Sequence, residues 1–409
     1  MNSLPRRSFL RSSIALTAAS AVVAHAPNAF SQIENKIRRV GVIGHTGRGN
    51  FGHGLDTVWL KVSGAEIVGV ADANDAGLTN ALKTLNVDPS GGFTDYREML
   101  KSKRPEYVAV CSRHPDQHAA MTIAAIEAGA RGVYVEKPVC RTPAEADDML
   151  AAANKHGAKI AVAHRNRYHP ALPVIEKRIA DETIGKLLEI RGRGKGDRRG
   201  GGEDLWVLGS HVLNLAHFFG GDPLTCSATM LQDGRRVTEN DVRDGAEGLG
   251  PLAGNELHAR YEMSSGVVVY FDSIANDDTD SAGFGLQLVG SRGIISIACD
   301  RDPLAHLVPG NPFLADTENP RPWIPITSGG IGAPEPNPAA VANAQNHVAP
   351  VIDLIAACES EDDRRTPLCD GKAAAKTVEM ICAVFESHRL ESAAVPFPLA
   401  QRDNALDLL

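Results

Sequence analysis

Short apolar runs alternate with helix-like segments from residue 37 to residue 163, and this alternation restricts the fold more than any other feature of the chain. The runs occupy residues 37–44, 66–71, 107–111, 133–135 and 159–163. One helix-like segment opens with Thr142-Pro143-Ala144-Glu145, a capping box with proline at the first helical position. Repeated strand–helix–strand units predict parallel pairing, so we expect a doubly wound α/β sheet of the Rossmann type.

A second group of strand-like runs follows a different pattern. Glycine-rich or aspartate-rich turns separate runs at 187–191, 224–231, 257–263, 267–274, 284–289 and 294–298. Consecutive strands after a βα-alternating region predict a separate, antiparallel sheet in an α+β domain. Residues 347–358 and 373–388 have helical patterns. Residues 300–345 are rich in proline, asparagine and glycine, and we expect them to form a long loop.

Length and composition support two globular domains. A chain of 409 residues is too long for one small core, and we place the domains at 37–165 and 166–400. The net charge of −8 argues against nucleic acid or an anionic membrane as partner. Outside the N-terminus no apolar run reaches the length of about 18 residues that a membrane span requires.

Disulfides and metal sites are not expected. The seven cysteines are scattered and form no Cys-x-x-Cys pair, so most should be small buried thiols. His114 and His118 have an i, i+4 spacing that two metal ligands could use. The sequence favours a different interpretation, in which His118 lies at the start of a helix.

A glycine-rich turn follows the first strand. Residues Gly44, Thr46, Gly47 and Gly49 match the dinucleotide fingerprint G-x-G-x-x-G, with Thr46 in place of the middle glycine. Such a turn lets the backbone approach a pyrophosphate, whose charge then lies at a helix N-terminus. The alternative is a plain glycine loop.

Asp72 strengthens the dinucleotide interpretation. It ends the second strand, 28 residues after Gly44, where a carboxylate can accept hydrogen bonds from both ribose hydroxyls of NAD. Ala73 and Asn74 follow, so no arginine is present for a 2′-phosphate. NAD is favoured, NADP stays possible, and a helix cap is the alternative role for Asp72.

The run 133–135 ends in Glu136-Lys137-Pro138. Proline forces Lys137 into extended backbone, and the Lys137–Pro138 bond is a candidate for the cis form. A lysine on a stiff turn at the carboxyl end of a strand lies where open α/β sheets bind ligands. Lys137 is our first candidate for a catalytic residue, with Glu136 beside it. The alternative is that Lys137 only orients a ribose or pairs with Glu136.

These features resemble the glucose-fructose oxidoreductase/inositol dehydrogenase (Gfo/Idh/MocA) family. Beyond the motifs above, the resemblance extends through Asn166-Arg167-Tyr168-His169-Pro170, Ile184-Gly185-Lys186, Gly209-x-His211, Gly290-Ser291-Arg292-Gly293 and Val395-Pro396. It implies a Rossmann domain, then an α+β domain with a large open, mostly antiparallel sheet that often forms oligomer contacts. It also implies hydride chemistry on sugars or polyols with NAD(P). Gly44, Thr46, Gly47, Gly49, Asp72, His118, Glu136 and Lys137 would contact the cofactor.

His211 is the second catalytic candidate, on a helix expected from Glu203 to Phe219. The family usually has an aspartate four residues before this histidine, where Val207 stands here. Asn214 replaces another common aspartate. Asp204 shares the helical face but is two turns away, roughly 10 Å by helix rise. The alternative for His211 is a histidine of the core.

Four further residues are candidates for substrate binding: Arg165, Arg167, Tyr168 and Asp204. The first three follow the last strand of the Rossmann pattern, where the domains should meet, and could contact hydroxyls or a carboxylate. An interdomain salt bridge is the alternative. The basic segment 191–199 could close over an anionic sugar, although a solvated loop is favoured.

The N-terminus resembles an export signal of the twin-arginine type. Arg6-Arg7 is followed by Phe9-Leu10 and an apolar stretch from Ile14 to Ala26, and cleavage is expected before Gln32. We therefore separate residues 1–31 from the fold and expect a periplasmic or otherwise exported protein that uses an export machinery for folded proteins. Such a protein can carry a bound cofactor with it.

The expected function is an exported oxidoreductase with tightly bound NAD(H), acting on a sugar or polyol and assembling as a homodimer or homotetramer. Two alternatives stay open: a redox-neutral NAD-dependent sugar lyase or glycosidase, and a non-catalytic dinucleotide-binding protein. The departures at Val207 and Asn214 motivate the last of these.

Overall fold

Six parallel strands form the first sheet of the protein. The computed structural model describes residues 36–315 and 320–409. Within them the sheet has the order β3-β2-β1-β4-β5-β6, which confirms the predicted doubly wound arrangement. The strands are β1 (Arg38–Ile43), β2 (Ala65–Ala71), β3 (Gly92–Phe93), β4 (Tyr107–Val110), β5 (Gly132–Val135) and β6 (Lys159–Val162). Sequence reasoning did not locate β3, because two residues carry no periodic signal.

Helices cover both faces of this sheet. On one face pack α2 (Tyr96–Lys103), α3 (His118–Glu127) and α4 (Pro143–His156). The predicted cap of α4 is present: the backbone N–H of Glu145 donates to the Thr142 hydroxyl over 3.1 Å. The opposite face is covered by α1 (Asp75–Thr84) and by the 3₁₀ helix η1 (Thr57–Lys61).

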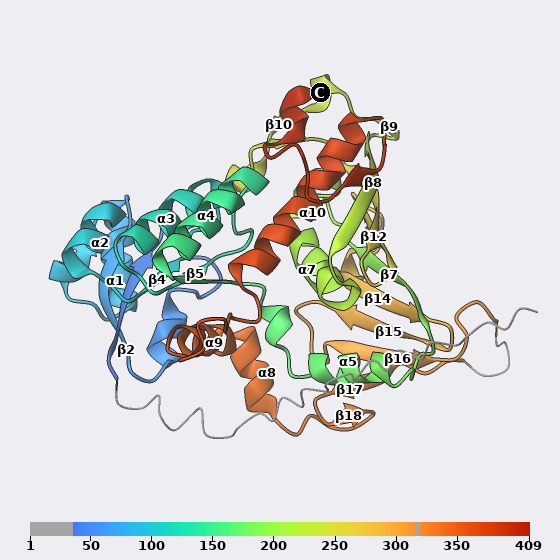
Figure 1. Cartoon of the computed structure of the whole chain (residues 1–409), viewed down its shortest axis with the longest axis horizontal. Coiled ribbons are helices and arrows are strands. Elements are labelled where there is room, and N and C mark those ends of the chain that lie inside the picture. The colour runs from blue at the N-terminus through green and yellow to red at the C-terminus, as the bar shows by residue number, and fades with distance from the viewer. Residues whose placement is uncertain (1–35, 316–319) are drawn as a thin grey trace, which may run out of the picture. The chain divides into compact units, whose positions relative to one another are not determined.

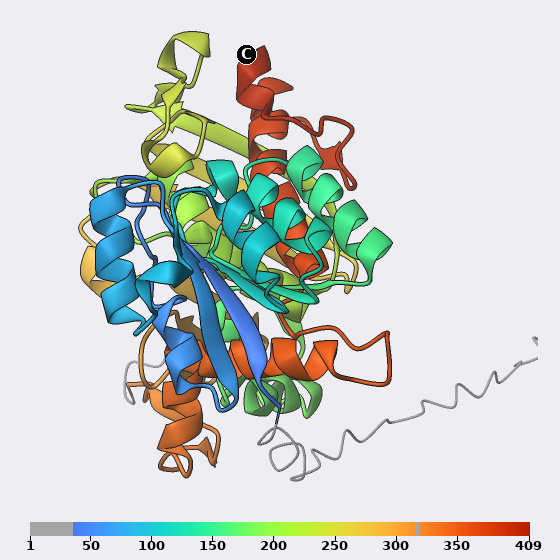
Figure 2. The same ribbon diagram turned by 90° about the vertical axis from the view of Figure 1, so that its left-hand side faces the viewer.

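A helix from the C-terminal region completes the second face. Helix α9 (Val348–Cys358) packs beside η1 and contributes Val351, Leu354 and Ile355 to the core under β4, β5 and β6. Figure 2 shows α9 in orange-red next to the blue strands. Just beyond α9, the Glu359 carboxylate accepts two hydrogen bonds from the buried Arg38 guanidinium, at 3.0 and 2.8 Å. Residues 37–409 therefore form one compact unit, in which the C-terminal region is part of the Rossmann core.

The second sheet has eleven strands and is mostly antiparallel, as the sequence predicted. Its order is β18-β17-β16-β15-β14-β7-β13-β12-β8-β19, with β9 beside β8, and among the described strands only β7 and β13 pair in parallel. The central strands are β7 (Leu187–Arg193), β8 (Pro223–Gln232), β12 (Glu256–Met263), β13 (Val268–Ile274), β14 (Gly285–Gly290) and β15 (Gly293–Ala298).

Three helices cover one face of the second sheet. They are α6 (Gly201–Val207), α7 (Gly209–Gly220) and α10 (Gly371–Arg389). Helix α10, drawn in red, runs between α4 and the second sheet (Figure 1). The single helix predicted from Glu203 to Phe219 is wrong in one respect, because the helical hydrogen-bond pattern is interrupted at Leu208 and the segment forms two helices.

The long loop predicted for residues 300–345 is also wrong in part. It contains β16 (Ala305–Pro309), β17 (Ile324–Thr327), β18 (Gly330–Ile331) and α8 (Pro338–Gln345). The sequence did not predict these strands because β16 and β17 contain proline, which argues against a strand. Both strands lie towards the edge of the sheet, where a missing backbone N–H is tolerated.

The remaining elements are short. The strands are β9 (Arg235–Arg236), β19 (Val395–Pro396), and the separate pair β10 (Arg243–Asp244) and β11 (Pro251–Leu252). The helices are α5 (Leu172–Ala180), η2 (Pro89–Gly91), η3 (Pro115–Gln117), η4 (Arg165–Tyr168), η5 (Glu239–Asp241), η6 (Ala246–Gly248), η7 (Asp280–Ala282) and η8 (Ala405–Leu408).

Two predictions concern the N-terminus and the membrane. The proposed signal at residues 1–31 lies outside the described residues. Within the described ranges, no helix combines the length and apolar character that crossing a bilayer requires.

Candidate functional site

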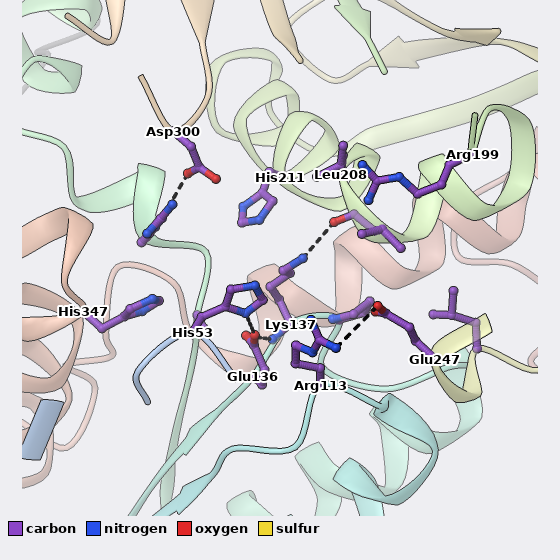
Figure 3. A pocket seen from close by; sticks show the side chains of 15 residues that line it. His53, Arg113, Glu136, Lys137, Arg199, Leu208, His211, Glu247, Asp300 and His347 are labelled. Atoms are coloured by element: carbon purple, nitrogen blue, oxygen red, sulfur yellow. Dashed lines mark hydrogen bonds and ion pairs between the residues drawn. The ribbon is translucent and has the colours of Figure 1, made fainter. Parts of the chain in front are cut away.

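A pocket of about 180 Å³ lies where the carboxyl ends of the Rossmann strands face α6 and α7. Figure 3 shows side chains that reach it from both parts of the fold. Lys137, which follows β5, and Arg165, which follows β6, come from the Rossmann side, and Leu208 and His211 from the helix pair. The topology therefore brings together Lys137 and His211, the two residues that the sequence proposed as catalytic.

The amine of Lys137 is held by the break between α6 and α7. Its Nζ donates a hydrogen bond to the carbonyl oxygen of Val207 over 2.8 Å. In a continuous helix that carbonyl would accept from the N–H of His211, but this N–H donates to Leu208 instead. The break therefore frees a backbone acceptor for the lysine. The Lys137–Pro138 bond is cis.

The Glu136 carboxylate is buried and fully engaged. One oxygen accepts the backbone N–H of Lys137 over 2.7 Å, and the other accepts a hydrogen bond from Nδ1 of His53. Burial pushes the pKa of Glu136 up, but the His53 contact and the nearby charge of Lys137 outweigh it and bring the pKa to about 2. Glu136 is therefore ionised and fixes the Lys137 turn.

Burial lowers the pKa of the Lys137 amine below its ordinary value of 10.5. The Arg199 charge acts in the same direction, whereas Glu136, Glu247 and Asp300 oppose it. Within a largely buried pocket, the amine is thus closer to the neutral form than a solvated lysine is. That shift is the one a general base needs.

His211 lies deep in the pocket and has no orienting carboxylate. Its Nδ1 is buried and has no hydrogen-bond partner among residues 36–315 and 320–409. Burial holds the pKa of His211 well below 6.5, and the charge of Lys137 adds to the effect. Its ring packs against His164 and Phe284, with centroids 5.5 and 5.9 Å away. At neutral pH it is an uncharged imidazole.

Asn214 and Asp204 both point away from His211. The Asn214 amide donates to the Thr377 hydroxyl over 3.1 Å, towards α10. The Asp204 carboxylate is buried and accepts from the Ser273 hydroxyl and the Lys195 backbone, at 2.7 and 3.1 Å. Asp204 is absent from the pocket wall, so the predicted substrate contact is not supported by its position.

Of the three residues predicted after β6, only Arg165 lines the pocket. Its Nε donates to Asp300 over 3.0 Å. Arg167 lies over the ring of Phe218, 3.8 Å from the centroid, and Tyr168 donates to Asp353 over 3.1 Å. The last two residues connect neighbouring segments and do not face the pocket.

The glycine turn differs from the expected one. The sequence predicted a helix directly after it, but the first helical residue is Thr57, and η1 is a 3₁₀ helix of five residues. Gly47, Gly49, Asn50, His53 and Gly54 all have positive φ, which a right-handed helix excludes. The pyrophosphate would therefore face the backbone of a loop.

Close approach of the backbone explains two glycines of this loop, Gly49 and Gly52. A Cβ on Gly49 would lie 2.5 Å from the backbone nitrogen of Arg113, and one on Gly52 would lie 2.5 Å from the Arg113 side chain. The turn is therefore packed tightly against the segment that follows β4. Only glycine leaves the backbone this close, which suits a cradle for a phosphate group.

Asp72 lies at a second pocket, of about 200 Å³, formed with Gly44, Tyr96 and Gln117. Its carboxylate accepts the backbone N–H of Thr46 at 3.0 and 3.1 Å and the Thr46 hydroxyl at 2.6 Å. It also accepts the N–H of Asn74 over 2.9 Å. Thr46, which the sequence read as a replaced glycine, thus anchors the turn to the end of β2. Asp72 suits the ribose of a dinucleotide, the glycine turn suits its pyrophosphate, and the Lys137 pocket suits its nicotinamide.

His118 lies at the start of α3, as the sequence predicted, and the structure shows that it is fully buried. Its Nδ1 lies 2.8 Å from the Pro138 carbonyl oxygen and its Nε2 lies 2.6 Å from that of Ser112. A neutral imidazole has one N–H, so it donates to one of these oxygens at a time. Burial lowers its pKa, although both carbonyls oppose the shift. His118 connects the turn after β4 to the Lys137–Pro138 turn.

Sequence reasoning missed several residues of the pocket wall: His53, Arg113, Glu247, Asp300 and His347. They come from loops or helix starts that meet only in the folded chain. Arg199 is a partial exception, because it belongs to the basic segment 191–199, a candidate for binding an anionic sugar. Among the described residues, no group of three or more histidine, cysteine or acidic side chains is arranged to hold a metal ion.

Comparison with known proteins supports the assignment of the first sheet to a dinucleotide-binding domain. Residues 38–164 match the model of an oxidoreductase family with an NAD-binding Rossmann fold, GFO_IDH_MocA. The chain is 26% identical to D-apiose dehydrogenase of Paraburkholderia graminis over 48% of its length, and 24% identical to levoglucosan dehydrogenase of Pseudarthrobacter phenanthrenivorans over 57%. These matches span 54% and 65% of the two relatives, less than two thirds of either.

Solved structures share the whole architecture. Levoglucosan dehydrogenase in complex with NADH and levoglucosan superposes with a TM-score of 0.66 at 18% identity, covering 89% of this chain and 100% of that one. WlbA dehydrogenase of Bordetella pertussis, in complex with NADH and UDP-GlcNAcA, gives a TM-score of 0.62 at 16% identity, with 89% and 100% covered. At such identities the likeness establishes the fold.

Fold and site together define a protein with an NAD-binding Rossmann half and an appended open sheet. Residues 38–164 match the Gfo/Idh/MocA oxidoreductase family model. The predicted family resemblance, fold class and NAD-type cofactor domain are thereby confirmed.

Proposed function

We propose that this protein is an NAD-dependent oxidoreductase that acts on a hydroxyl-bearing carbon of a sugar or polyol. The observation that carries the proposal is the partly buried amine of Lys137, which lies on a turn at the carboxyl end of β5 and donates a hydrogen bond to the Val207 carbonyl. When bound, oxidised nicotinamide accepts a hydride from the substrate carbon.

Lys137 supplies the acid–base half of the reaction. During oxidation the substrate loses a hydride from carbon and a proton from its hydroxyl, and the neutral amine takes that proton. Burial lowers the amine pKa, which increases the fraction able to act as a base. In the reverse direction the ammonium returns the proton to the new alkoxide.

The substrate class is inferred from the pocket and from the relatives. The pocket presents guanidinium, carboxylate and imidazole groups from Arg165, Asp300 and His347 around Lys137. Such donors and acceptors suit a small molecule with several hydroxyls. Two relatives are dehydrogenases of D-apiose and levoglucosan, both named for sugars or sugar derivatives.

We also propose that the protein is exported with its nucleotide bound. The support is the Arg6-Arg7 pair followed by the apolar stretch 14–26, a pattern typical of signals for folded proteins. Cell fractionation tests the location. Nucleotide recovered by acid from protein purified out of the exported fraction tests retention, and an empty exported protein would contradict it.

A homo-oligomer is a further proposal. The face of the second sheet that carries Arg191, Arg260 and Tyr270 is half-exposed or exposed. A large open face of this kind is suited to pairing with another copy. Light scattering on the purified protein measures the mass, and a monomer across the working concentration range would contradict the proposal.

The central experiment is a panel of sugars and polyols monitored at the nicotinamide absorbance. The expected result is net reduction of NAD with at least one of them. Turnover of a sugar that left the cofactor redox state unchanged would instead favour the redox-neutral alternative. A protein that bound neither NAD nor NADP would overturn the proposed function.

A further inference from the structure

We infer that His347 is a substrate-binding residue whose Nε2–H donates a hydrogen bond to an oxygen of the sugar or polyol. The inference rests on the proposed function and extends it to a residue between α8 and α9 that has no sequence motif. Figure 3 shows the His347 ring directed towards the pocket, across from Lys137 and His53.

The first observation is an unused polar atom. His347 is 3% exposed, and its Nε2 has no hydrogen-bond partner in the described parts of the chain. A buried ring nitrogen without a partner costs free energy, on the order of 1–3 kcal/mol. In a pocket wall, this cost is removed when a ligand atom supplies the partner.

The second observation fixes which ring nitrogen carries the proton. Nδ1 of His347 lies 2.6 Å from the hydroxyl oxygen of Tyr134. Tyr134 is fully buried, and the described residues offer its hydroxyl hydrogen no other acceptor. The tyrosine therefore donates to Nδ1, which leaves the hydrogen of a neutral imidazole on Nε2.

The charge state agrees with this tautomer. Burial lowers the pKa of His347 to about 4, so the ring is neutral in ordinary buffers. Glu136 and Asp300 raise the pKa, while Arg165 and His53 lower it. A neutral N–H donor matches a hydroxyl or carbonyl oxygen and carries no net charge that would require an anionic substrate.

The backbone shows that the ring position is imposed by the fold. His347 has φ +63°, a left-handed conformation that few non-glycine residues adopt. Its carbonyl accepts the N–H of Val351 over 3.2 Å and so begins α9. The start of this helix and the Tyr134 hydroxyl together hold the ring in one orientation.

His347→Asn is the matched variant for testing this role. Asparagine tolerates positive φ, and its Oδ1 is attached to Cγ as Nδ1 is in histidine, so it can still accept from Tyr134. The variant lacks only the Nε2–H group that would donate to the sugar. In the NAD-loaded enzyme we expect KM for the sugar to rise about 2- to 12-fold. The kcat should stay nearly unchanged, because the contact is present in both ground and transition states.

A spectroscopic measurement tests the tautomer without turnover. In histidine-labelled protein, ¹⁵N shifts distinguish a protonated ring nitrogen from an unprotonated one. We expect His347 to carry its proton on Nε2 in the wild type and to become a tautomer mixture in Tyr134→Phe. This result does not depend on whether His347→Asn folds.

Three outcomes would overturn the inference. They are an unchanged KM in folded His347→Asn, a proton on Nδ1 in the wild type, and a wild-type enzyme that turns over no sugar. The last outcome alone marks failure of the proposed function. The first two leave an active wild type and therefore remove only the role of His347.

Discussion

At the residue scale, the neighbours Glu136 and Lys137 show how burial acts in opposite ways on an acid and a base. Glu136 keeps its charge because a backbone N–H and His53 compensate for lost water. Lys137 has one neutral carbonyl as its partner, and its pKa falls. The same strand end thus carries a fixed anion and an amine that can exchange a proton.

Replacing Lys137 by methionine tests the general base. The length and apolar stem are kept while the amine is removed, so we expect kcat to fall by about 10²- to 10⁴-fold. NAD should stay bound, because the Asp72 pocket is untouched. Steady-state rates and the nucleotide content of the variant provide the measurement. Full activity in a folded, NAD-loaded Lys137→Met protein would contradict the assignment.

Asp72→Ala tests the ribose contact. Hydrogen bonds to a charged group contribute about 1.5–3 kcal/mol, so we expect the Kd for NAD to rise by about 10-fold or more. The variant also frees Thr46 from its anchor, which acts in the same direction. Calorimetric titration of nucleotide-free protein measures the change. Asp75→Ala is the matched control, because Asp75 is exposed on the first turn of α1 and lines neither pocket.

At the element scale, the loop from Gly44 to Asp56 occupies the position where the sequence predicted a helix N-terminus facing the pyrophosphate. Its positive φ values prevent helix formation, and η1 with α9 fills the face that a longer helix would cover. Likewise the α6–α7 break at Leu208 converts an intrahelical carbonyl into the partner of Lys137. Both irregularities lie at the pocket, where departures from ideal geometry have a chemical use.

Gly52→Ala tests the packing of this loop. The added Cβ would meet the Arg113 side chain at 2.5 Å and the Glu136 carboxylate at 3.0 Å. We expect the free energy of unfolding to fall by about 1–3 kcal/mol, together with a loss of turnover, since Glu136 positions Lys137. Urea unfolding and kcat provide the measurements.

Gly129→Ala serves as its control. Unlike Gly52, Gly129 has no neighbour that an added Cβ would meet within 4 Å, but its φ of +101° adds backbone strain. It should lose some stability while keeping wild-type turnover. Equal loss of turnover in both variants would show that the effect is not specific to the contact with Arg113 and Glu136.

At the scale of the whole molecule, buried histidines couple stability to pH, and His164 and His347 are two of them. Burial lowers the folded-state pKa of His164 to about 3 and of His347 to about 4, from an ordinary value of 6.5. At pH values between the folded-state pKa and 6.5, these histidines are protonated in the unfolded chain and neutral in the folded one. The contribution of these histidines to the free energy of unfolding is therefore fully present above about pH 6.5 and is lost progressively as the pH falls towards 4.

We expect the free energy of unfolding to decrease by up to ~3 kcal/mol per histidine over that range. Urea titrations between pH 7.5 and 4.5 measure the slope. His347→Asn should flatten it, whereas His156→Gln, at an exposed position on α4, should not. A pH-independent unfolding free energy in the wild type would contradict the prediction.

Local patterns were enough to predict much of the fold. Strand β5 could be located because Val133, Tyr134 and Val135 are consecutive apolar residues, and α4 because Thr142 and Pro143 mark its start. Asp72 and Lys137 could be proposed because each follows a strand directly. A residue at the carboxyl end of a parallel strand has a position that connectivity alone determines.

Other residues could not be predicted because their roles depend on distant parts of the chain. His347 lines the pocket since α9 returns to the Rossmann sheet, and its ring is oriented by Tyr134, 213 residues earlier. Arg167 and Tyr168 are adjacent to Arg165, yet they contact Phe218 and Asp353 instead of the pocket. Adjacent positions in a 3₁₀ turn point in different directions, and only packing selects the one that faces the site.

The amino-acid sequence by itself determined the two sheets, the dinucleotide turn and the lysine at the strand end, because short-range periodicity and connectivity fix strands and their edges. The tertiary structure decided the partners: the carbonyl that holds Lys137, the histidine on Glu136, and the wall that His347 completes. Hydrogen bonds and desolvation depend on atoms brought within a few ångströms from remote segments, and no local pattern encodes that distance.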